Sequence, residues 1–131
     1  MNKWDLEPDE INFDYSGYAC LIKKIPRLLN LCGYVLIPKE HFLYDKSMDE
    51  LNEILDVHGG ITFNNYLTKY EYFIGFDCGH AGDIIPEIHR YMPELLIDRP
   101  NWSYKDSDYV RNELKSLVDQ IIILGRGIKN E

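Results

Sequence analysis

Apolar and polar side chains alternate along the first part of the chain in the pattern of paired β-strands. Residues 11–15 alternate one by one, which is the period of a half-buried strand. Ser16 and Gly17 then predict a two-residue turn, and residues 18–25 continue as a second strand, so the two form a hairpin. After Pro26, residues 31–37 form a mostly apolar run that predicts a third strand, ended by Pro38.

The centre of the chain predicts a short helix followed by two further strands. Ser47 and Glu50 have the spacing of a capping box, and the next residues repeat their apolar positions at helical spacing. This helix should end before residue 58. Residues 61–63 and 70–77 predict two strands, with Asn64 and Asn65 as the turn between them. The second of these strands carries apolar groups on both faces, which is typical of a central strand.

The last element predicted is a long amphipathic helix that starts at residue 106 or 107 and reaches about residue 124. Its apolar stripe consists of Tyr109, Val110, Leu114, Leu117, Val118, Ile121 and Ile122. Gly125 is well placed to end it. We therefore expect an α+β fold in one domain, residues 1–131, with a mainly antiparallel sheet of about five strands and the long helix packed on it. Residues 1–9 should be an extended lead-in and residues 126–131 a polar tail.

Charge and cysteine content narrow the classes of partner. The 131 residues carry a formal charge of -8, whereas binding to nucleic acids or anionic membranes needs clustered basic residues. We therefore expect no nucleic-acid partner and no membrane partner. The three cysteines are far apart in sequence, no signal peptide is evident, and no apolar run is long enough to span a membrane. We therefore expect a cytoplasmic protein with reduced thiols.

Two glycine-rich polar segments border predicted strands and are the candidate site. They are His58-Gly59-Gly60 and the run Asp77-Cys78-Gly79-His80-Ala81-Gly82-Asp83. Glycine and alanine let a ligand approach backbone amides closely, and such amides can hold a phosphate without net positive charge. Aspartates could accept hydrogen bonds from ribose hydroxyls, and tyrosines could stack on a base. The predicted ligand-binding residues are Tyr34, Tyr44, His58, Gly59, Gly60, Asp77, Gly79, His80, Ala81, Gly82 and Asp83.

Other interpretations of the same residues stay open. The glycines could simply form tight turns at strand ends. His58, Asp77, Cys78, His80 and Asp83 include possible metal ligands, although their spacing matches no metal signature, and we predict neither a metal nor a cofactor. Cys78 lies two residues from His80 and could be a nucleophile, although a buried structural cysteine fits as well. We therefore assign no catalytic residue.

The segments around these glycines resemble a family of small, mostly uncharacterised bacteriophage and prophage proteins. The resemblance rests on His58-Gly59-Gly60-Ile61-Thr62 and on residues 73–83, and it extends over about residues 10–122. It implies a phage setting and carries no established activity. Small acidic phage proteins are often anti-defence factors, and one class of these sequesters nucleotide alarm signals.

The leading hypothesis is a non-enzymatic phage protein that sequesters a small nucleotide-derived immune signal in the host cytoplasm. Cyclic ADP-ribose derivatives and cyclic dinucleotides are the ligand classes considered. We expect a homodimer, joined through the last helix or a sheet edge. Two alternatives remain, a metal-dependent hydrolase acting on a nucleotide and an acidic inhibitor that binds a host defence protein.

Overall fold

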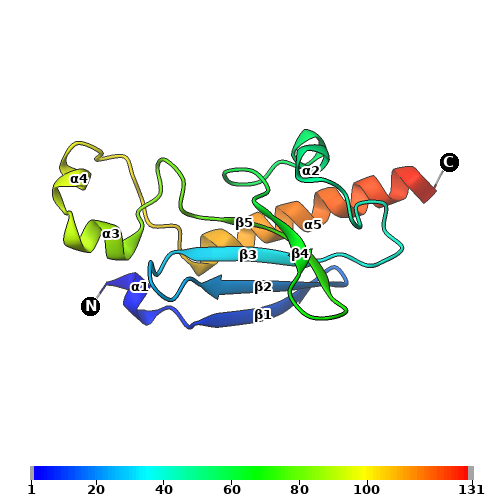
Figure 1. Ribbon diagram of the computed structural model, residues 1–131, viewed down its shortest axis with the longest axis horizontal. Helices are drawn as coiled ribbons and strands as arrows, with labels where there is room; N and C mark the ends of the chain where they lie inside the picture. The colour runs from blue at the N-terminus through cyan, green and yellow to red at the C-terminus, as the bar shows by residue number, and fades with distance from the viewer. Residues whose placement is uncertain (1, 130–131) are drawn as a thin grey trace.

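A computed structural model describes residues 2–129 and is organised around one five-stranded antiparallel sheet (Figure 1). The strands lie in the order β1-β2-β3-β5-β4, and each neighbouring pair is antiparallel. Their bounds are Glu10–Tyr15 (β1), Tyr18–Lys24 (β2), Leu31–Leu36 (β3), Phe63–Tyr66 (β4) and Tyr72–Asp77 (β5). With the helices described below, this confirms the predicted α+β fold.

The hairpin of β1 and β2 forms as predicted. Tyr15 pairs with Tyr18 across the turn, and Ser16 and Gly17 both have a positive φ, 50° and 84°. Positive φ at both central residues is what a tight two-residue hairpin turn needs to match the twist of its strands. β5 is central, as expected, because it pairs with both β3 and β4.

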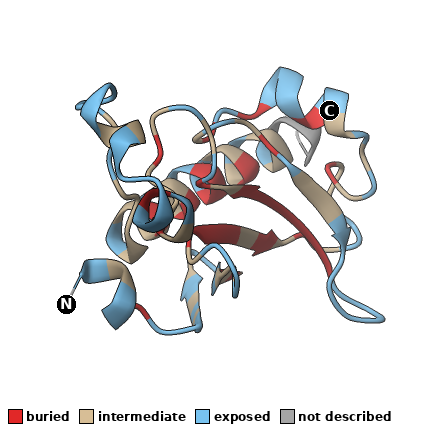
Figure 2. Cartoon of the chain, turned by 60° about the vertical axis from the view of Figure 1, so that its left-hand side comes forward, coloured by how far each residue is buried: buried red, intermediate tan, exposed pale blue. Residues whose placement is uncertain are grey.

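The long helix α5 (Ser107–Lys129) covers one face of the sheet, and the core lies between them (Figure 2). Five residues of its apolar stripe have no exposed surface: Val110, Leu114, Leu117, Val118 and Ile121. The close approach depends on Gly33 in β3. A Cβ atom there would lie 2.8 Å from the Phe76 ring and 3.0 Å from Val110 Cγ1. Apolar burial of this kind is the main source of the fold's stability.

Of the four shorter helices, three lie at one end of the molecule, and α2 lies above the sheet on the side toward the C-terminus (Figure 1). Helix α2 (Met48–Ile54) starts at Ser47, whose Oγ accepts a hydrogen bond from the Glu50 N–H at 3.2 Å, as the capping box predicted. Helices α3 (Pro86–Tyr91) and α4 (Glu94–Ile97) form the opposite end. No helix in the described part of the chain is both long enough and apolar enough to cross a membrane.

Both ends of the chain differ from the prediction. The segment 1–9 is not wholly extended, because Lys3–Leu6 form helix α1. That helix is tied to the start of α5: Lys3 pairs with Asp106, and Glu7 Oε1 accepts a hydrogen bond from the Ser107 N–H at 3.1 Å. The lead-in therefore caps the long helix.

The end of α5 was also predicted too early. The helix continues past Gly125 to Lys129, into the segment expected to be a polar tail, whereas residues 130–131 lie outside the described residues. Gly125 is needed for packing, because a Cβ there would lie 2.9 Å from His41 Nε2. The same His41 nitrogen lies 3.0 Å from the Ile121 carbonyl oxygen.

The predicted turn at Asn64 and Asn65 is wrong, because both residues belong to β4. The reversal comes later, where the Leu67 N–H donates to the Glu71 carbonyl at 3.0 Å. Asn64 is accommodated in the strand because its Nδ2 donates to the Lys46 carbonyl at 2.9 Å. Consequently Tyr70 is in the turn and 81% exposed, rather than in the strand.

Replacing Gly33 by Ala should destabilise the protein without changing its fold. The added methyl group would push Phe76 and Val110 apart, which should cost about 1–3 kcal/mol. Urea unfolding of Gly33→Ala, beside Asn12→Ala on the exposed face of β1, measures this. A free energy of unfolding within about 0.5 kcal/mol of the parent would contradict the packing described.

Candidate functional site

The two glycine-rich segments, residues 58–60 after α2 and the 77–83 loop after β5, lie side by side in the structure. The imidazole of His80 rests against the backbone of Gly59, where a Cβ atom would lie only 2.2 Å from His80 Cδ2. Gly59 also has a φ of 69°, which other residues rarely adopt. The His58 and His80 rings have centroids 6.2 Å apart. Gly59 is therefore required both by its own backbone and by the position of His80.

The carboxylate of Asp83 is fully buried and joins three segments of the chain. Its Oδ2 lies 2.8 Å from His58 Nε2 and accepts a hydrogen bond from the His80 N–H at 3.0 Å. Its Oδ1 lies 3.2 Å from Lys105 Nζ, an ion pair in which the lysine directs its hydrogen bonds to the Ser103 hydroxyl and nearby carbonyls. A buried carboxylate without such partners would be very costly, so these contacts hold the loop in place.

His58 connects this carboxylate to α5. Its Nδ1 lies 2.8 Å from the Tyr109 hydroxyl, and its backbone N–H donates to Glu113 Oε1 at 2.8 Å. A carboxylate can only accept, so His58 Nε2 carries the hydrogen toward Asp83, and a neutral ring then accepts from Tyr109 at Nδ1. Burial, with the nearby Glu113 charge, raises the pKa of Tyr109, which keeps its hydroxyl protonated.

His58 and Asp83 were predicted to contact a ligand. In the structure the Asp83 carboxylate is fully buried, and both nitrogens of the His58 ring contact other side chains of the chain. We assign these two residues a positioning role. They fix the start of α5 and both glycine-rich segments relative to one another.

A second histidine–aspartate pair lies nearer the surface. His80 Nε2 is 3.1 Å from Asp77 Oδ1, and about a third of each side chain is exposed. The pair is a close contact rather than an aligned hydrogen bond, since Nε2 is buried and makes no hydrogen bond of good geometry. Asp77 is oriented independently, because it accepts from the Gly79 N–H at 2.9 Å and from the Thr62 hydroxyl at 3.1 Å. The nitrogen of His80 left to reach a ligand is Nδ1.

Two backbone amides in the 77–83 loop are free. The Asp83 N–H donates to the His80 carbonyl at 2.9 Å, which closes a turn with Gly82 at a φ of 95°. No described residue accepts a hydrogen bond from the N–H of Ala81 or of Gly82. Adjacent unpaired amides in such a turn form an anion-binding feature.

The 77–83 loop forms one wall of a cavity of about 320 Å³. Gly79, His80 and Ala81 line it from the loop, and the other walls are Ile85, Ile88, His89, Leu95, Arg99 and Trp102. The Arg99 guanidinium lies 5.2 Å from the centre of the Trp102 ring, and its Nη1 donates to the Leu95 carbonyl at 3.1 Å. Apolar walls with a few polar groups are the usual composition of a small-molecule site.

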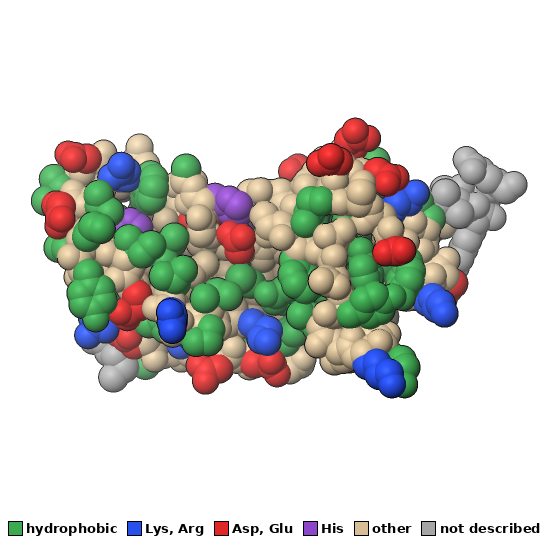
Figure 3. Space-filling view, viewed as in Figure 1, with side chains coloured by type: hydrophobic (Ala, Val, Ile, Leu, Met, Phe, Trp, Pro, Cys, Tyr) green, Lys and Arg blue, Asp and Glu red, His purple; other side chains and the backbone are tan. Residues whose placement is uncertain are grey.

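The cavity lies beside an exposed apolar surface on α3, α4 and the residue that follows α3 (Figure 3). The side chains that form this surface are Ile88, Tyr91, Met92 and Ile97. A larger hollow of about 370 Å³ adjoins the cavity at His89 and is lined by Trp4, Asp5, Arg90 and others. None of the predicted site residues lines that hollow, so the smaller cavity is the better candidate.

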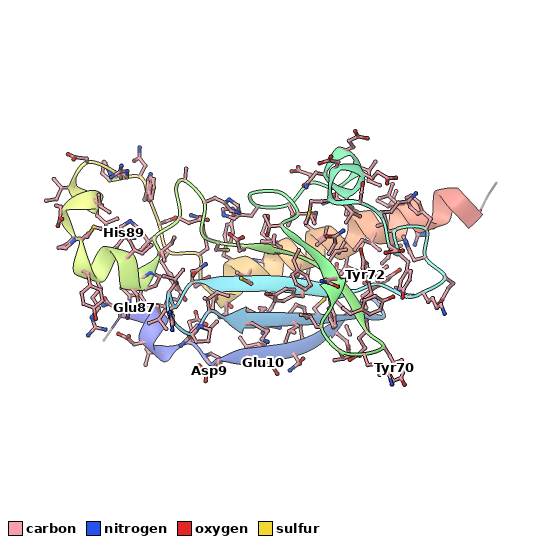
Figure 4. All side chains as sticks on the ribbon, viewed as in Figure 1. Asp9, Glu10, Tyr70, Tyr72, Glu87 and His89 are labelled. Atoms are coloured by element: carbon pink, nitrogen blue, oxygen red, sulfur yellow. The ribbon has the colours of Figure 1, made fainter. Side chains whose placement is uncertain are left out.

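The predicted tyrosines are elsewhere. Tyr34 lies on the sheet face opposite α5, against Gly75, with its ring 5.2 Å from Phe63. Tyr44 packs with Tyr66 and Tyr72, and Figure 4 shows Tyr72 at the far end of the molecule from His89. The aromatic ring that lines the cavity together with the 77–83 loop is Trp102. Its one signal in the sequence is an aromatic residue in a polar loop.

The geometry supports neither Cys78 as a nucleophile nor a metal site among residues 2–129. Cys78 is 1% exposed and belongs to the core, and burial together with the Asp83 charge raises the pKa of its thiol. A buried thiol with a raised pKa is a poor nucleophile. Within residues 2–129, no three histidine, cysteine, aspartate or glutamate side chains come together as metal ligands.

Comparison with known proteins adds no further assignment. No family model, no curated protein and no solved structure matches the chain. The resemblance to phage proteins stays a prediction.

Replacing Asp83 by Ala should be among the most destabilising changes to a polar residue. It leaves Lys105 and His58 without their buried partner, which should cost about 3–5 kcal/mol. Denaturant unfolding of Asp83→Ala measures the loss, and Asp119→Ala on the exposed side of α5 is the matched control. A loss below about 1 kcal/mol would contradict the central role given to this carboxylate.

The three thiols should be unreactive in the folded protein. All are buried, and burial raises the pKa of Cys20 and of Cys32 to about 11. A thiol reagent such as 5,5′-dithiobis(2-nitrobenzoate) at pH 8 should label none of them until denaturant is added. Rapid labelling of one thiol without denaturant, identified as Cys78 by peptide mapping, would revive the nucleophile hypothesis.

Proposed function

We propose that this chain binds a small, anionic, ring-bearing molecule of the nucleotide class in the cavity between the 77–83 loop and Trp102. One observation carries the proposal. Two free backbone amides, at Ala81 and Gly82, belong to the same loop that lines a cavity containing an indole and a guanidinium. The amides suit a phosphate, and Trp102 suits a base.

The charge of the protein is compatible with this ligand. A net charge of -8 works against long polyanions, which bind through many basic contacts. A single phosphate needs only local donors, and Ala81 and Arg99, which both line the cavity, carry such donors. The volume, about 320 Å³, is at the lower end for ligand sites. It suits one base with its phosphate, so a cyclic dinucleotide or an ADP-ribose derivative would extend beyond it.

The biological setting that we propose is sequestration. A phage protein that holds a nucleotide immune signal in the host cytoplasm would blunt the defence response. A homodimer fits this role and would form through a sheet edge. The last helix is not a suitable interface, because the stripe that we expected to join two subunits is buried against the sheet of its own chain.

Replacing Trp102 by Ala should weaken binding of a cyclic dinucleotide or ADP-ribose derivative. Loss of one stacking contact should cost about 1–3 kcal/mol, or roughly 5- to 150-fold in Kd. Isothermal titration calorimetry over a panel of these compounds measures it, with the exposed Tyr70→Ala as the control. No binding by the parent protein, or equal binding by Trp102→Ala, would refute the proposal.

A further inference from the structure

We infer that the same cavity carries acid–base chemistry: His80, held by Asp77, activates water to hydrolyse a phosphodiester bound there. The inference rests on the proposed ligand site and goes beyond sequestration, which needs binding alone. The His80 ring is held against Gly59 and beside Asp77, an arrangement that binding alone does not require.

The imidazole of His80 is held from two sides. Gly59 provides a flat backbone surface for the ring, and Asp77 Oδ1 lies 3.1 Å from Nε2. Asp77 is itself held by the Thr62 hydroxyl and the Gly79 N–H. The Asp77 carboxylate beside Nε2 stabilises the imidazolium that forms when Nδ1 takes a proton. Nδ1 is left as a proton acceptor on a residue that lines the cavity.

Donors for the negative charge of the reacting phosphate come from two other places. The amides of Ala81 and Gly82 follow His80 directly and are unpaired among the described residues. His89 lines the same cavity, and its Nδ1 lies 3.0 Å from the Ile85 N–H, which can donate to it. In the tautomer whose Nδ1 accepts from the Ile85 N–H, instead of donating to the Ile85 carbonyl oxygen 3.0 Å away, the hydrogen lies on Nε2 and His89 is a hydrogen-bond donor. Fixed donors in a cavity stabilise charge that develops during reaction.

The reaction balances without any further reactant. His80 Nδ1 removes a proton from water as the water oxygen bonds to phosphorus. The bond from phosphorus to the leaving oxygen breaks, and the leaving oxygen takes the proton from His80. The products are a phosphate monoester and an alcohol, and His80 returns to its neutral form. Asp77 touches only His80 and is a positioning residue, whereas His58 and Asp83 hold the loop.

The test uses bis(4-nitrophenyl) phosphate, a phosphodiester with aromatic rings and a coloured leaving group. The purified protein should release 4-nitrophenolate in the presence of EDTA. His80→Gln should lower kcat about 10²- to 10⁴-fold, the usual contribution of a positioned acid–base group. Asp77→Asn should lower kcat with little change in KM, because it acts through His80. Asp119→Asn, on the outer side of α5, should leave the rate unchanged.

The outcomes separate this inference from the proposed binding. If calorimetry detects bound nucleotide while neither the probe nor that nucleotide is hydrolysed, the catalytic inference is wrong and sequestration stands. If nothing binds and nothing is hydrolysed, both are wrong. Hydrolysis that His80→Gln and Asp77→Asn leave unchanged in folded protein, or that EDTA abolishes, would also overturn the role given to His80.

Discussion

The arrangement of the site depends on one buried carboxylate. Asp83 has no exposed surface, yet it contacts His58, the His80 amide and Lys105. Through these contacts it joins the segment after α2, the loop after β5 and the approach to α5. A charge without water is tolerated only when its partners are in place, so the three segments must come together or the carboxylate is left unsatisfied. The shape of the cavity wall follows from that requirement.

Because Asp83 is buried and Asp77 is not, the two histidine–aspartate pairs have different roles. The inner pair, His58 with Asp83, is shielded and joined to Tyr109, and its polar atoms contact the protein itself. The outer pair, His80 with Asp77, is partly exposed and borders the cavity. The inner pair thus positions the loop, and the loop in turn presents His80 and two free amides. The proposed function therefore depends on the outer pair, and the position of the outer pair depends on the inner pair.

The sequence predicted the parts that local patterns determine. The hairpin at Ser16 and Gly17, the helix cap at Ser47 and the stripe of α5 follow from alternation, turn chemistry and helical period. The Asn64 turn failed because a contact with the Lys46 carbonyl overrides the preference of asparagine. The glycine-rich segments were recognised from composition. Trp102 and Arg99 were not, because they follow α4 and come to the cavity only through the path that α3 and α4 give the chain. Tyr34 and Tyr44 were chosen by residue type, and no local signal could show which end of the sheet they occupy.

The most direct test is to follow the backbone and indole N–H signals by NMR while cyclic di-adenosine monophosphate is added. The largest shifts should occur at the amides of Ala81 and Gly82 and at the indole N–H of Trp102. Signals of the distant cluster formed by Tyr44, Tyr66 and Tyr72 should stay in place. Shifts confined to that tyrosine cluster, or no shifts at millimolar ligand, would contradict a nucleotide site at the 77–83 loop.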